Sequence, residues 1–229
     1  MELKLVIFDM DGVILDSERV ANLAWFQVSE KYNLGLTLEK LRDIKGGTTV
    51  RTEGILAKLV GEEMAKKILV EKKEKQLEII KSEGGIKLKK GVVELLKYIK
   101  EKGLKCVVAT STSRESAERQ LKETGVYKYF DTLTFGDEIE NGKPAPDIFL
   151  KACEKVKVSP EEAIVIEDSV LGATAANRAM IRCFVVEDTI KFTEEENKLA
   201  YKKFENLLKV KEYLEKYNWQ LSKIIIYLS

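Results

Sequence analysis

The chain of 229 residues is long enough for one large domain, or for a core domain with a smaller companion. Its 39 basic and 38 acidic residues leave a net charge of only +1, so no charge excess favours a nucleic-acid or membrane-surface partner. The chain contains no histidine. This excludes Ser-His-Asp and Cys-His catalysis and His-ligated zinc, and it leaves acid–base chemistry to carboxylates, Lys, Tyr or Cys.

Three cysteines, Cys106, Cys153 and Cys183, have no metal-binding spacing. Their apolar surroundings predict buried free thiols, which fit a reducing compartment. No targeting segment and no window of about 18 apolar residues is present, so we expect a soluble, cytoplasmic protein without a membrane partner. The apolar tail at residues 224–228 is too short to cross a bilayer. We expect it to pack on the fold or to contact another copy, in a monomer or a weak homo-oligomer.

In chain order, the first predicted element is a buried strand at residues 5–8, a continuous apolar run. Residues 16–85 then show only helical periodicity, with breaks at glycines. The residues that share a helix face are Ala21, Trp25, Val28 and Tyr32, and further on Ala65, Ile68 and Leu69; the breaks fall at Gly35, Gly46, Gly47, Gly61, Gly84 and Gly85. This block predicts an inserted helical domain over 16–85, and a core domain built from 1–15 and 86–229.

From Gly91 onward, helices and short apolar runs alternate. The predicted strands are residues 106–109, 133–135, 163–166 and 183–186; the predicted helices are 92–99, 113–123 with Ser113 as N-cap, one that opens at 144–147, 169–180, and a last one that carries Leu207, Val210, Leu214 and Tyr217. Repeated strand–helix units predict an α/β fold, with a Rossmann-like parallel sheet covered by helices on both faces.

Polar side chains follow three of these strands at the point where each strand ends. They are Asp9 and Asp11 after the first strand, Thr110 to Ser113 after the second, and Glu167 and Asp168 after a later one. Ligands of open α/β sheets bind at the carboxyl ends of the strands, so we expect these groups to gather there. Each group alone also fits a structural role, as a turn or a helix cap. Several carboxylates together need a cation, and oxygen ligands favour Mg²⁺, while hydroxyls before a helix favour phosphate.

Four ordered segments resemble the motifs of the haloacid dehalogenase superfamily, in the subgroup that contains β-phosphoglucomutase and phosphoglycolate phosphatase. The segments are Asp9-Met10-Asp11-Gly12-Val13-Ile14-Leu15-Asp16-Ser17, Ala109-Thr110-Ser111, Gly142-Lys143-Pro144-Ala145-Pro146-Asp147 and Ile166-Glu167-Asp168-Ser169. The resemblance extends over nearly the whole chain. It implies a sheet core with a small helical cap, formed here by residues 16–85.

The resemblance also implies a role for each matching residue. Asp9 would be the nucleophile and Asp11 the general acid and base, while Ser111 would bind the transferring phosphoryl group. Lys143 would neutralise that group and orient Asp9.

The implied cofactor is Mg²⁺. Its ligands would be Asp9, Asp168 and the backbone carbonyl of Asp11, with Glu167 as a ligand or as a support for one. The residues expected to bind substrate are Lys45, Gly46, Gly47, Thr48 and Arg51 in the cap, and Thr112 in the core.

The implied activity is Mg²⁺-dependent hydrolysis of a small phosphorylated metabolite, most simply a sugar phosphate, through an aspartyl-phosphate. Asp11 argues against dehalogenases, which lack this acid, and against transport ATPases, which have Thr there. The alternative is a phosphosugar mutase, and a more remote one is an inactive binding module. β-Phosphoglucomutases use a His and an Arg where this chain has Val20 and Thr49, with Arg51 nearby as a substitute, so we expect hydrolysis.

Overall fold

A six-stranded, fully parallel sheet forms the core of the computed structural model, which describes residues 2–216. The strands are β1 (Leu5–Phe8), β2 (Lys105–Thr110), β3 (Thr132–Phe135), β4 (Ala163–Glu167), β5 (Arg182–Val186) and β6 (Lys202–Phe204). Their order in the sheet is β3-β2-β1-β4-β5-β6, so the chain runs from β1 to one edge of the sheet and then crosses to the other side of β1. A crevice at the carboxyl ends of β1 and β4 is expected from this switch of direction.

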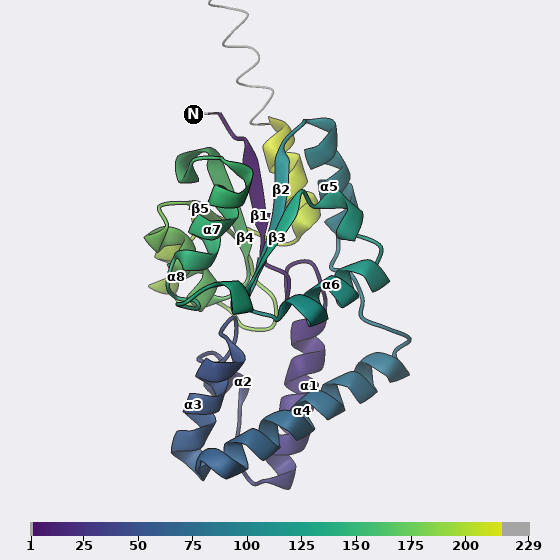
Figure 1. The fold of residues 1–229 in the computed structure, drawn as a ribbon, viewed down its shortest axis with the longest axis vertical. Coiled ribbons are helices and arrows are strands. Elements are labelled where there is room, and N and C mark those ends of the chain that lie inside the picture. The colour runs from purple at the N-terminus through teal and green to yellow at the C-terminus, as the bar shows by residue number, and fades with distance from the viewer. Residues whose placement is uncertain (1, 217–229) are drawn as a thin grey trace, which may run out of the picture.

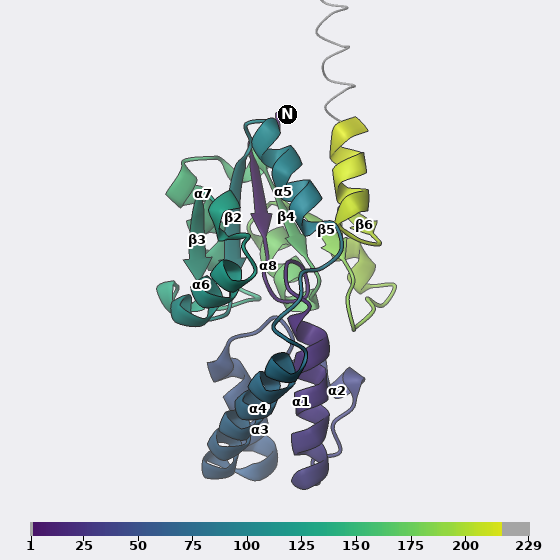
Figure 2. The same cartoon turned by 90° about the vertical axis from the view of Figure 1, so that its right-hand side faces the viewer.

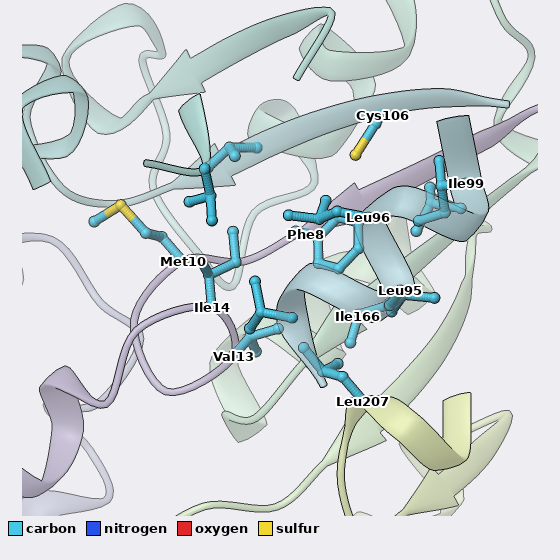
Figure 3. Close-up of a cluster of buried hydrophobic side chains, with 14 of the residues drawn as sticks. Phe8, Met10, Val13, Ile14, Leu95, Leu96, Ile99, Cys106, Ile166 and Leu207 are labelled. Atoms are coloured by element: carbon cyan, nitrogen blue, oxygen red, sulfur yellow. The ribbon is translucent and has the colours of Figure 1, made fainter. Parts of the chain in front are cut away.

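Helices cover both faces of the sheet (Figures 1 and 2). They are α5 (Val92–Glu101) and α6 (Arg114–Glu123) with the helical residues 207–216 on one face, and α7 (Asp147–Val156) and α8 (Val170–Arg178) on the other. Because side chains alternate along a strand, Val6 and Phe8 face the first group while Leu5 and Ile7 face the second. Figure 3 shows Phe8 surrounded by Leu95 and Leu96 of α5 and by other apolar side chains.

The segment between β1 and α5 is helical and lies beyond the carboxyl ends of the strands (Figure 1). Its helices are α1 (Ser17–Lys31), α2 (Leu38–Leu41), α3 (Thr49–Val60) and α4 (Glu62–Ser82). A hydrophobic cluster of its own joins them, with Trp25, Leu56 and Ile68 among its buried members. The helical segment therefore has a separate core and lies at the carboxyl end of the sheet. The domain limits themselves stay a prediction.

The parallel α/β fold expected from the sequence is confirmed, and the five expected strands differ from the observed ones by at most one residue at either end. β6 was not expected. Ser113 lies at the N-cap position of α6, as expected, although its side chain makes no capping hydrogen bond. The three cysteines are buried and unpaired, as expected. Tyr217 and the tail at 224–228 lie outside the described residues.

Among residues 2–216, no helix is both long enough and apolar enough to span a membrane.

Candidate active site

The candidate site lies at the carboxyl ends of three adjacent strands and receives one lysine from a loop. The register pairs Phe8 of β1 with Val108 of β2 and with Ile166 of β4. The residues that follow these positions are therefore neighbours, and the backbone N–H of Asp9 donates to the Ile166 carbonyl at 3.0 Å. The structure thus brings the acidic and hydroxyl groups of the three strand ends together.

Lys143 is the central cation of the site. Its ammonium donates to Asp9 Oδ1 at 2.5 Å and to Glu167 Oε1 at 2.6 Å, and all three side chains are buried. Burial lowers the pKa of Lys143, but the two carboxylates more than offset this, so the net shift is upward. Lys143 is therefore charged at neutral pH and holds one Asp9 oxygen, which leaves the other oxygen for chemistry.

Lys143 alone does not balance the negative charge of Asp9 and the carboxylates around it. Burial raises the pKa of Asp9 well above its ordinary value; Lys143 opposes this rise, while Glu167, Asp168 and Asp11 add to it. A nucleophilic carboxylate must be ionised, so the cluster has room for a further cation.

Glu167 is bound at both of its oxygens. While Oε1 accepts from Lys143, Oε2 accepts from the backbone N–H groups of Asp168 and Ser169 at 2.8 Å each and from the Ser169 hydroxyl at 3.0 Å. Gly172 makes room for this carboxylate, because a Cβ there would lie 1.6 Å from Oε1. Of the two roles expected for Glu167, this geometry favours supporting its neighbours.

The carboxylate of Asp11 is positioned by two hydroxyls. Ser17 Oγ donates to Oδ1 at 2.6 Å and Thr112 Oγ1 donates to Oδ2 at 2.8 Å. Gly12 follows with φ of +80°, and a Cβ at this glycine would lie 2.0 Å from Asp168 Oδ2. Only glycine allows this close approach, which brings the Asp11 loop against Asp168.

A loop of the helical segment enters the site between α2 and α3. Lys45 is 7% exposed, and its Nζ lies 2.7 Å from Asp168 Oδ2. Burial raises the pKa of Asp168 to about 6, although Lys45 opposes this rise. The carbonyl of the neighbouring Gly46 accepts from Ser111 Oγ at 2.9 Å. The loop thus contacts both the carboxylate expected to bind metal and the hydroxyl expected to bind phosphate.

A cavity of about 660 Å³ lies between the strand ends and the helical segment. Of the predicted site residues, those that line it are Asp9, Asp11, Lys45, Gly46, Gly47, Ser111 and Thr112. Lys143, Glu167 and Asp168 are buried behind this lining.

Two predicted cap residues do not line the cavity. Thr48 is the N-cap of α3 and accepts from the Arg51 N–H, and the Arg51 side chain donates to the Asp43 carbonyl at 3.2 Å. The structure gives these two residues local structural contacts, which does not support their expected role in binding substrate.

Several cavity residues were missed by the sequence reasoning. They are Ser17, Glu18 and Asn22 on α1, and Lys72 and Gln76 on α4. A signal for them exists, because Glu18 and Asn22 continue the helix face marked by Trp25, just as Lys72 continues the face of Ile68. A polar residue on a face that is otherwise packed indicates a site rather than a core.

Comparison with known proteins identifies the family. Residues 6–186 match the family model described as haloacid dehalogenase-like hydrolase. The chain therefore belongs to the haloacid dehalogenase-like hydrolases, and the resemblance seen in the four motifs is confirmed.

Three similar proteins illustrate the relationship. A phosphorylated carbohydrates phosphatase from Thermotoga maritima is 36% identical over 184 residues, which cover 78% of this chain and 82% of that protein. A hydrolase from Pseudomonas syringae superposes with a TM-score of 0.80 at 23% identity, over 93% of this chain and 98% of that one. A β-phosphoglucomutase from Clostridium difficile gives 0.76 at 23% identity, over 96% and 99%. At 23% identity, the two structures share the fold alone.

Proposed function

We propose that the chain is a Mg²⁺-dependent phosphatase that hydrolyses small phosphorylated carbohydrates through an aspartyl-phosphate on Asp9. One observation carries this proposal: Asp9 faces a large cavity at the strand ends while Lys143 holds one of its oxygens at 2.5 Å. The substrate class is supported by the 36% identical relative, which is named for phosphorylated carbohydrates.

The acidic residues fit a hard divalent cation. Asp9, Glu167 and Asp168 each offer an oxygen, and the three oxygens lie within 4.8 Å of one another among buried side chains. Carboxylate oxygens alone favour Mg²⁺ over softer ions. Asp168 Oδ2 is buried and has only the ion pair with Lys45 within the described structure, whereas Glu167 Oε1 accepts from Lys143 and Oε2 accepts from three donors of its own loop. We therefore assign Asp9, Asp168 and the Asp11 backbone carbonyl as ligands, with Glu167 as their support.

When bound, the metal would supply positive charge that balances the carboxylates and the transferring phosphoryl group. The protein's own residues would do the remainder. Asp9 attacks phosphorus, and the bond from phosphorus to the alcohol oxygen breaks as Asp11 gives that oxygen a proton. Water then attacks the aspartyl-phosphate while Asp11 takes its proton, which releases phosphate and restores Asp9.

The hydroxyl contacts seen in the structure fit these roles. Thr112 and Ser17 orient Asp11, and Lys143 orients Asp9. To hold the phosphoryl group, Ser111 would exchange its bond to the Gly46 carbonyl for one to a phosphate oxygen. In this proposal, residues 16–85 act as a cap that excludes bulk water from the intermediate.

A phosphatase and a phosphosugar mutase make different products from the same substrate. The two positions at which a mutase is expected to carry His and Arg are a buried Val20 and Thr49, and the nearby Arg51 is bound to the Asp43 carbonyl. We therefore expect free phosphate to accumulate when β-glucose 1-phosphate is supplied with a trace of the 1,6-bisphosphate. The measurement follows phosphate and glucose 6-phosphate together. Faster formation of glucose 6-phosphate would favour the mutase.

The two acids that end β4 are expected to differ in their effect on Mg²⁺ binding. Asp168→Asn removes the negative charge of a direct ligand and should weaken Mg²⁺ binding more than about 100-fold, beyond the scale for supporting residues. Glu167→Gln keeps an acceptor for the loop N–H groups and should weaken it by about 10–100-fold, as supports of metal ligands do. Isothermal titration of the chelator-treated protein with Mg²⁺ measures both affinities. The opposite order of effects would make Glu167 the direct ligand.

A further inference from the structure

Two helices of the proposed cap present hydrogen-bonding side chains to the cavity. Glu18 and Asn22 lie four residues apart on α1, and Lys72 and Gln76 lie four residues apart on α4. Residues at this spacing share one face of a helix, so each helix turns one polar pair toward the cavity. The two helices pack against each other, as Figures 1 and 2 show, so the pairs belong to one wall.

Glu18 lines the cavity with free acceptor capacity on both of its carboxyl oxygens. Asp9 is bound by Lys143, and Asp11 is bound by Ser17 and Thr112. By contrast, Glu18 is partly buried and makes no hydrogen bond or ion pair within the described part of the chain. A ligand that supplies donors would therefore bind the Glu18 carboxyl oxygens without displacing a partner within the described chain.

The position of Glu18 places it beside the reacting groups. A Cβ on Gly12 would lie 3.0 Å from Glu18 Cγ, so Glu18 packs on the loop that carries Asp11. In the proposed mechanism Asp11 protonates the leaving oxygen, so a side chain that packs on the Asp11 loop is positioned to meet the leaving alcohol.

The carboxyl group of Glu18 matches hydroxyl groups better than a second phosphate. A carboxylate only accepts hydrogen bonds and an ammonium only donates them, whereas amides and hydroxyls do both. A second phosphate is itself an acceptor and would leave Glu18 without a donor. Lys72 Nζ already donates to Gln76 Oε1 at 2.6 Å and lies 5.4 Å from the Trp25 ring centroid, which fixes its ammonium at the wall.

We propose, on the basis of the phosphatase function proposed above, that Glu18 determines substrate specificity by accepting hydrogen bonds from hydroxyls of the leaving alcohol. Lys72 donates to a further hydroxyl of the same group. The preferred substrates are then monophosphates of polyhydroxylated compounds, rather than bisphosphates or phosphates of apolar alcohols.

The test compares sorbitol 6-phosphate with hexyl phosphate, which share the phosphate and a six-carbon chain but differ in hydroxyls. For the wild type we expect kcat/KM to be at least about 100-fold higher for the polyol phosphate, because a site built for hydroxyls rejects an analogue without them. In Glu18→Leu we expect this ratio to fall at least about tenfold, with hexyl phosphate hydrolysed as well as before or better. Retained hexyl phosphate turnover also shows that the variant is folded.

Two further variants sharpen the result. Glu18→Gln keeps one acceptor and should give an intermediate ratio. Glu30→Leu makes the same kind of change at an exposed position of α1 and should keep the wild-type ratio. An unchanged ratio in Glu18→Leu, or a wild-type preference for fructose 1,6-bisphosphate over fructose 1-phosphate, would overturn the role of Glu18 and leave the phosphatase standing. No phosphate release from any monoester by the wild type would instead overturn the proposed function itself, and the role of Glu18 with it.

Discussion

Asp9→Asn is expected to lower turnover of any phosphate monoester by about 10⁴-fold or more, the scale seen when a catalytic nucleophile is removed. The substitution nearly preserves shape, and the amide oxygen can still accept from Lys143, which donates to Asp9 at 2.5 Å. What is lost is the negative oxygen that attacks phosphorus. The fold should survive, because Lys143 keeps Glu167 as its partner at 2.6 Å.

The measurement for Asp9 is rapid-quench labelling with a radiolabelled phosphate monoester. The wild type should carry label that is stable in acid and labile in base, as an acyl phosphate is, and Asp9→Asn should carry none. The matched control is Asp43→Asn, an exposed carboxylate outside the cavity, which should label like the wild type. Label that persists in Asp9→Asn would place the nucleophile on another residue.

Most of the sheet could be predicted from the sequence because its strands are buried on both faces. Runs such as residues 5–8 and 163–166 are apolar at every position, which few other structures allow. β6 lacks this signal, since two of its three residues are lysines at the sheet edge. Charged residues protect an edge strand from further pairing, and the same charges hide it from a search for apolar runs.

The site was predictable where its groups follow strands, and less so where it depends on packing between segments. The positions of Asp9 and Asp11 follow from the end of β1. That Lys45 would lie 2.7 Å from Asp168 could not be predicted, because the contact depends on how the helical segment docks on the sheet. The free carboxylate of Glu18 could not be predicted either, because the packing of the other segments decides whether any side chain reaches it. Sequence patterns predict elements and their ends, whereas contacts between distant segments need the fold.

Lys143→Met is expected to lower the free energy of unfolding by about 3–5 kcal/mol at neutral pH, in the absence of metal. Methionine fills a similar volume but leaves Asp9 and Glu167 buried without the cation that they share. Activity should fall as well, because nothing then orients Asp9. The size of the loss should depend on pH, and the sign follows from the pKa of Asp9.

The pKa of Asp9 in the folded protein is already raised by burial, and Lys143 is the group that lowers it. Without Lys143 the pKa rises further, so the folded variant keeps the Asp9 proton to a higher pH than the unfolded chain does. A group whose pKa is raised in the folded state favours folding at low pH and loses this benefit as the pH rises. The deficit of Lys143→Met relative to the wild type should therefore be smaller at pH 5 than at pH 7.5.

Urea unfolding at both pH values, with a chelator present, measures this deficit. The control is Lys155→Met, which removes a lysine that is paired with Glu138 at a partly exposed position. Such a pair contributes about 1 kcal/mol or less, so the control should lose little stability at either pH. A deficit in Lys143→Met no larger than in Lys155→Met, or one that does not change with pH, would contradict the view that Lys143 holds the buried carboxylates together by its charge. The expected result would instead link stability and catalysis in one residue, because the ammonium that makes the buried acids tolerable also prepares Asp9 for attack.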